Sequence, residues 1–141
     1  MPDTTADAET YEDEAWKLAK DGFLNVLQNF EGPRPRFISW LIAIPYSLFG
    51  RSILMAQSIN LLFGIGSVYL SWIVAKQIWD NQIARKVAWT VALFPSLILY
   101  SVILMREVYM VFFLLFALYG VISWYKNYSF KSIIIAITGF I

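Results

Sequence analysis

The sequence contains no cysteine and no histidine. Without cysteine, the chain cannot form a disulfide, a zinc–thiolate site or a thiol nucleophile. Without histidine, it also lacks the side chain that most often transfers protons near neutral pH. Any chemistry must therefore use carboxylates, arginine, lysine, tyrosine or serine.

Charged residues are scarce as well. They make up 15% of the 141 residues, whereas ordinary globular domains contain about 25%. Hydrophobic residues make up 59% and aromatic residues 18%, a composition typical of membrane proteins. There is no basic cluster of the kind that binds nucleic acid, and residues 1–10 contain no apolar core that could act as a signal peptide. We therefore expect membrane lipids, and not nucleic acid, around this chain.

The few charges are distributed unevenly. Residues 1–31 hold eight acids and two lysines, whereas residues 32–141 hold nine bases and two acids. The densest acidic run covers residues 7–15. Two interpretations of this run are open: a soluble acidic segment tethered to a membrane anchor, or an acidic active-site loop held over a membrane-embedded cavity.

The region before the apolar segments is predicted to form short helices. Residues 11–30 carry apolar side chains at helical spacing and charges on the other face, and Gly22 favours a break into two helices. Such amphipathic helices can lie in the membrane interface or pack on a protein surface. A turn rich in proline and arginine follows at residues 31–36. Residues 38–50 are apolar, but a span needs about 20 residues, so we predict a short juxtamembrane helix with both ends on one side of the membrane.

Three longer apolar segments are predicted to be transmembrane helices. They cover residues 53–75, 87–105 and 108–125, and Pro95 should kink the second. Another helix begins at residue 132, but ten residues cannot cross about 30 Å of hydrocarbon. We therefore expect the chain to be an N-terminal fragment of a longer protein.

These segments predict an all-α fold: a polytopic transmembrane helix bundle with an external first loop that contains amphipathic juxtamembrane helices. Residues 1–36 form the external acidic region and residues 37–141 the membrane domain. Small or polar residues form one stripe of the first span and should let another helix approach closely. The stripe consists of Asn60, Gly64, Ser67 and Ser71.

Orientation follows from the basic loops at residues 76–86 and 126–131, which the positive-inside rule places in the cytoplasm. The acidic region then lies on the non-cytoplasmic face of the cell inner membrane or plasma membrane. Arg106 and Glu107 fall on that same face, between two apolar segments with almost no loop. Ionisable residues in such a place are costly and often functional. The alternative role is an interfacial anchor that snorkels to the surface.

Several short motifs follow one another along almost the whole chain. They are Asp7-x-x-x-Tyr11-x-x-x-Ala15, Gly22, Pro33, Pro35, Trp40, Leu48-Phe49-Gly50, Asn60, Leu93-Phe94-Pro95, Tyr100-Ser101 and Arg106-Glu107. Their order resembles the GT-C superfamily of integral-membrane glycosyltransferases, near the dolichyl-phosphate-mannose–protein mannosyltransferases and the aminoarabinose transferases. The preceding helix of the family, its later helices and its C-terminal domain have no counterpart in this sequence.

The resemblance implies a hexosyltransferase that moves a sugar from a polyprenyl-phosphate donor to a glycan, lipid or protein acceptor, usually with inversion. Asp7 best matches the catalytic carboxylate of the family, which deprotonates the acceptor hydroxyl as general base or orients the acceptor, and the other acids of residues 9–14 are alternatives for this role. Arg106, with Arg34 or Arg36, would bind the donor phosphate, since arginine binds phosphate bidentately. Glu107 would orient Arg106 or hold a divalent metal, and Tyr11 belongs to the substrate-binding motif.

Other interpretations remain open. A polysaccharide polymerase or ligase would share the lipid donor and the external acidic region. A non-enzymatic transport or assembly protein would explain the apolar spans, but not the Arg106–Glu107 pair. Within the acidic run, we assign Glu12, Asp13 and Glu14 to a solvated helix face and expect their neutralisation to change little. The fragment alone should be inactive.

Overall fold

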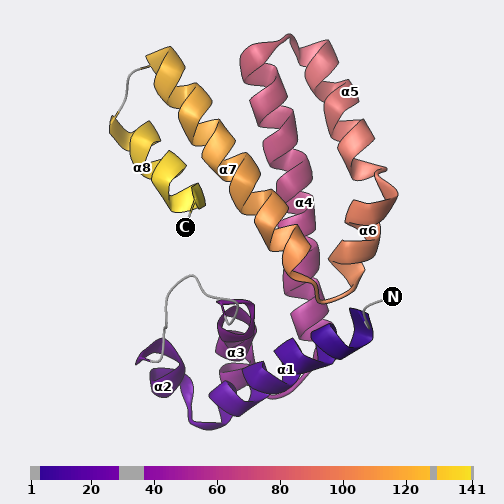
Figure 1. Cartoon of the computed structure of the whole chain (residues 1–141), viewed down its shortest axis with the longest axis vertical. Helices are drawn as coiled ribbons and strands as arrows, with labels where there is room; N and C mark the ends of the chain where they lie inside the picture. The colour runs from indigo at the N-terminus through magenta and orange to yellow at the C-terminus, as the bar shows by residue number, and fades with distance from the viewer. Residues whose placement is uncertain (1–3, 29–36, 128–129, 141) are drawn as a thin grey trace.

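The structure, a computed structural model, describes residues 4–28, 37–127 and 130–140. Within these ranges the chain is helical and contains no strand, as predicted. The helices are α1 (Thr4–Lys20), α2 (Phe23–Gln28), α3 (Phe37–Phe49), α4 (Ile53–Ile78), α5 (Asn81–Ala92), α6 (Pro95–Val102), α7 (Arg106–Asn127) and α8 (Phe130–Phe140). Figure 1 shows α1, α2 and α3 together at one end of the group formed by α4 to α8.

Among the described residues, two helices are long and apolar enough to cross a membrane. They are α4 and α7, and the bent pair formed by α5 and α6 would be a third. The predicted spans at residues 53–75 and 108–125 correspond to α4 and α7, each somewhat longer than predicted. Because α7 begins at Arg106, the Arg106–Glu107 pair lies in its first turn. The predicted short helix at 38–50 is α3, and the helix predicted from residue 132 is α8.

The kink predicted at Pro95 is present as a bend, but the single helix predicted over residues 87–105 is interrupted there. The segment forms two helices, α5 and α6, with an angle of 55° between them. Pro95 is the first residue of α6, and Phe94 before it is extended, with φ −70° and ψ 114°. Proline lacks a backbone N–H and disfavours helical geometry in the preceding residue, so it starts a new helix here and does not bend an existing one.

The acidic run is helical throughout, which corrects its description as a loop. It lies within α1, which begins at Thr4 and not near residue 11. Carboxylates near a helix N-terminus are electrostatically favourable. The predicted break is confirmed: α1 ends at Lys20 and Gly22 has φ +90°, a conformation that glycine adopts without strain. The predicted turn at residues 31–36 lies outside the described residues.

One buried cluster joins the three N-terminal helices to α4 and α7. Its members come from all five helices and from the α6–α7 connection: Ala15, Ala19, Val26, Ile38, Ile42, Ala43, Tyr46, Ala56, Leu104 and Tyr109. The rings of Phe37 in α3 and Phe113 in α7 also meet edge to face, with centroids 5.9 Å apart. The cluster therefore holds the acid-bearing helix α1 at the end of the molecule where α4 and α7 begin.

The small polar stripe of α4 is buried as predicted, and it packs against α6 and α7. The amide Nδ2 of Asn60 lies 2.7, 3.1 and 2.7 Å from the carbonyl oxygens of Tyr100, Ser101 and Ile103, so its two N–H groups are shared among three acceptors. These carbonyls lie at the C-terminal end of α6, where no further turn of helix supplies donors. Asn60 thus caps α6 from a neighbouring helix.

Gly64 faces Ser101 so closely that an added Cβ would overlap the serine side chain. We expect Gly64→Ala to lower the free energy of unfolding by about 1–3 kcal/mol, the usual cost of overpacking. The same substitution in a Ser101→Gly background should cost much less, because the obstructing side chain is gone. Thermal unfolding of the four variants in detergent measures both costs. Equal costs in the two backgrounds would show that α4 and α6 do not meet here.

Candidate functional site

Glu12 is the most deeply buried carboxylate of α1 among the residues whose burial is described, with 6% of its surface exposed. Its Oε1 accepts hydrogen bonds from the Arg51 Nε at 2.8 Å and from the Tyr46 hydroxyl at 3.2 Å. Its Oε2 accepts a second bond from the Arg51 guanidinium. Both oxygens are therefore engaged, and the paired arginine offsets the cost of burying this charge.

The next two acids of α1, Asp13 and Glu14, also accept hydrogen bonds from α3 and from the connection between α3 and α4. Asp13 Oδ1 accepts a hydrogen bond from Arg51 at 2.8 Å, and Glu14 Oε2 accepts one from the Ser39 hydroxyl at 3.3 Å. Ser39 lies in α3, and Arg51 lies in the connection between α3 and α4. Three consecutive acids of α1 thus attach this helix to α3 and to the start of α4.

The assignment of Glu12 and Glu14 to a solvated face is wrong. Their carboxylates are acceptors for side chains from residues 39–51, which local sequence spacing does not reveal. Arg51 was missed as a partner. The signal for it is a single arginine between two apolar helices, directly after Gly50, whose φ of +85° turns the chain. A charge in such a place needs an acidic partner.

Burial and the neighbouring carboxylate of Glu12 both raise the pKa of Tyr46. The pKa of the Tyr46 hydroxyl is raised from 10.0 to about 12. The largest cause is removal from water, the next are the negative charge of Glu12 and the hydrogen bond to it, and the positive charge of Arg51 partly opposes them. The hydrogen bond with Glu12 is the largest cause that raises the pKa of Arg51 above its ordinary value. Tyr46 stays neutral and Arg51 stays charged over the physiological range.

The raised Tyr46 pKa predicts a loss of stability in alkali. Because the folded pKa lies above the unfolded one, the contribution of Tyr46 is complete below about pH 10 and disappears as the pH rises towards about 12. We expect Tyr46→Phe to flatten the stability profile between these values. Tyrosinate absorbance and helix content, followed together through an alkaline titration, measure the effect. An unchanged profile in Tyr46→Phe would contradict this coupling.

Arg106 and Glu107 form the second charged feature. The Arg106 Nε lies 3.8 Å from the Glu107 Oε1, and the two side chains are 61% and 41% exposed. This is a loose pair, so the guanidinium keeps donors for an incoming anion. Backbone N–H groups at a helix N-terminus also favour phosphate. The buried Glu107 Oε2 has no hydrogen-bond partner among the described residues.

The remaining predicted site residues are only partly placed. Position 7 lies in the second turn of α1, but the Asp7 side chain is outside the described part of the structure. Tyr11 is partly buried in the same helix, one turn later. Arg34 and Arg36 lie outside the described residues. The described Asp and Glu side chains include no group of three or more suited to a metal ion, so the metal site stays a prediction.

Together, these features lie at one end of the molecule. The buried cluster contains Ala15 and Ala19 of α1 as well as Leu104 and Tyr109, which flank Arg106 and Glu107. An exposed arginine, an acid-rich helix and the ends of two apolar helices therefore occur in one region (Figure 1). Comparison with protein-family models, curated proteins and solved structures finds no match for this chain.

Proposed function

We propose that this chain belongs to a GT-C-type membrane glycosyltransferase that moves a sugar from a polyprenyl-phosphate donor to an acceptor outside the cytoplasm. The observation that carries the proposal is the position of the acid-rich helix α1, which packs on α3 and shares with α7 the buried cluster that contains Ala15 and Tyr109. A lipid-phosphate donor needs a cation close to apolar helices, and an acceptor hydroxyl needs a carboxylate.

Each group has a role in this proposal. Arg106 binds the donor phosphate, helped by the N-terminus of α7. Glu107, 3.8 Å away, orients the guanidinium. Asp7, the best match to the catalytic carboxylate of the family that the chain resembles, is the general base. Glu12 suits this role less, because both of its oxygens already accept hydrogen bonds from Arg51 or Tyr46. The apolar surfaces of α4 and α7 accommodate the lipid chain of the donor.

The role of Arg106 can be tested by donor binding. We expect Arg106→Ala to weaken binding of a polyprenyl phosphate at least about tenfold, since a hydrogen bond to a charged group contributes about 1.5–3 kcal/mol. The affinity of Arg106→Lys for polyprenyl phosphate should lie between those of the unchanged protein and Arg106→Ala, because lysine keeps the charge and loses the bidentate geometry. The measurement is a titration with polyprenyl phosphate in the protein at its full natural length.

Lys86→Gln is the matched control for that titration. It also removes one exposed positive charge, but it lies in α5, and we expect donor affinity to stay unchanged. Unchanged affinity in both Arg106 variants would remove Arg106 from the donor site. Equal weakening in the control would indicate a general charge effect.

A second candidate function is a non-enzymatic membrane protein used in transport or assembly. The observation in its favour is that Glu12, Asp13 and Glu14 all serve to attach α1 to neighbouring elements. Transfer of radiolabelled sugar from a polyprenyl-phosphate donor in membranes that contain the protein separates the two candidates. Donor binding without transfer to glycan, lipid or peptide acceptors would favour the second.

A further inference from the structure

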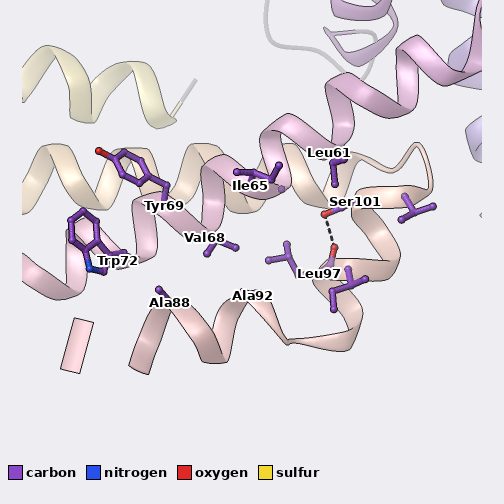
Figure 2. A pocket seen from close by; sticks show the side chains of 12 residues that line it. Leu61, Ile65, Val68, Tyr69, Trp72, Ala88, Ala92, Leu97 and Ser101 are labelled. Carbon is purple, nitrogen blue, oxygen red and sulfur yellow. Dashed lines mark hydrogen bonds between the residues drawn. The ribbon is translucent and has the colours of Figure 1, made fainter. Parts of the chain in front are cut away.

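A groove of about 490 Å³ lies between α4, α5 and α6. Figure 2 shows it extending from Trp72 and Ala88 at one end to Leu61 and Ser101 at the other. Its lining residues come from α4 and from both sides of the 55° bend between α5 and α6. Its lining is almost entirely apolar, and the Ser101 hydroxyl donates to the Leu97 carbonyl at 2.6 Å. The groove therefore offers a surface for hydrocarbon and few groups for a polar ligand.

One end of the groove has cations beside it. Lys76 follows Trp72 by one helical turn, and its Nζ lies 4.8 Å from the centroid of that ring. Arg85 precedes Ala88 by three residues and is exposed. Residues three or four apart share a helix face, so both cations continue the faces that line the groove. Lys86, the next residue of α5, lies on the opposite face of that helix.

The single acid near these cations has another role. Asp80 caps α5, since its carboxylate accepts a hydrogen bond from the backbone N–H of Ile83 at 2.8 Å. Exposed tryptophan side chains also surround this end, at Trp79 and Trp89, as is common where a protein meets lipid headgroups. This end of the groove thus combines positive charge with an aromatic boundary and an apolar channel.

We propose that the groove binds an acyl chain of an anionic phospholipid, whose phosphate lies between Lys76 and Arg85. Charge complementarity identifies the ligand: the channel suits hydrocarbon and the adjoining cations suit a negative headgroup. Basic pockets between membrane helices bind anionic lipids in this way. The inference does not depend on the proposed transferase activity, because the proposed headgroup site at Lys76 and Arg85 lies at the end of α4 opposite Arg106.

The test is a lipid titration of the purified chain in detergent, in which native mass spectrometry measures the bound lipid. Phosphatidylglycerol and phosphatidylcholine with identical acyl chains are compared. We expect phosphatidylglycerol to bind more tightly, and Lys76→Gln and Arg85→Gln each to weaken it about fivefold, the effect of one base near an anionic headgroup. Lys86→Gln is the matched control and should change the affinity less than twofold.

Two further measurements separate the parts of the proposal. Ala88→Trp should fill the channel and weaken both lipids, and Ala92→Leu is a milder version in case the larger residue disturbs folding. Inorganic phosphate should not displace the lipid, because the acyl chain supplies part of the affinity. Equal weakening by Lys86→Gln, equal affinity for the two lipids, or no effect of either channel substitution would each overturn the assignment.

Discussion

Asp7→Asn is expected to lower sugar transfer by about 10²–10⁴-fold, the usual loss when a general base is removed. The substitution keeps the size of the side chain and removes its capacity to accept a proton. Asp7 is selected within the acidic run partly by elimination, because Arg51 and Tyr46 engage both oxygens of Glu12. The measurement is the rate of transfer from a polyprenyl-phosphate donor as a function of pH, in the protein at its full natural length.

Glu9→Gln is the control for this experiment. Glu9 lies in the same helix and is exposed, so we expect near-normal rates. Donor binding should also be intact in Asp7→Asn, since the base acts on the acceptor. If Asp7→Asn retains normal turnover while Glu9→Gln abolishes it, the base has been misassigned. If both variants retain activity, the acidic helix is not catalytic.

The second large effect concerns stability. We expect Glu12→Ala to lower the free energy of unfolding by about 3 kcal/mol, the lower end of the range for removing one partner of a buried ion pair. We use the lower end of that range because the Arg51 side chain is 44% exposed and water can still solvate it after Glu12 is removed. The Tyr46 hydroxyl, in contrast, loses its carboxylate partner in a buried place. Chemical unfolding followed by circular dichroism measures the loss.

Two variants make this prediction specific. Glu9→Ala removes an exposed acid from the same helix and should change the free energy of unfolding by less than about 0.5 kcal/mol. The double variant Glu12→Leu/Arg51→Met should be more stable than Arg51→Met alone, because it leaves no buried charge unpaired. If Glu12→Ala and Glu9→Ala behave alike, α1 is not attached through this carboxylate.

The helices were largely predictable because their signals are local. Long apolar segments between charges predicted the positions of α4 and α7, and the shortness of the 38–50 segment predicted α3. The stripe that contains Asn60 and Gly64 indicated which face of α4 would be buried, since small residues on one face allow close packing. The break after Lys20 followed from Gly22, whose positive φ is a property of a single residue.

Only part of the site was predictable. The Arg106–Glu107 pair is visible in the sequence as charges between apolar segments, and the structure places it in the first turn of α7. The partner of Glu12 was not visible, because Arg51 is 39 residues away. Solvated and buried carboxylates look identical in one sequence, and only the packing of α1 on α3 distinguishes them.

Composition and periodicity alone establish a helical, apolar chain with an acidic N-terminal region, because they set which segments can form helices and enter lipid. The way in which those helices pack follows from the tertiary structure. It packed α5 and α6, which are separated at Pro95, against α4 and so formed the groove between these three helices. It also buried the Glu12 side chain of α1, where the carboxylate accepts hydrogen bonds from Tyr46 and Arg51. Both outcomes depend on contacts between residues far apart in the chain, whose free energies exist only once the helices have packed.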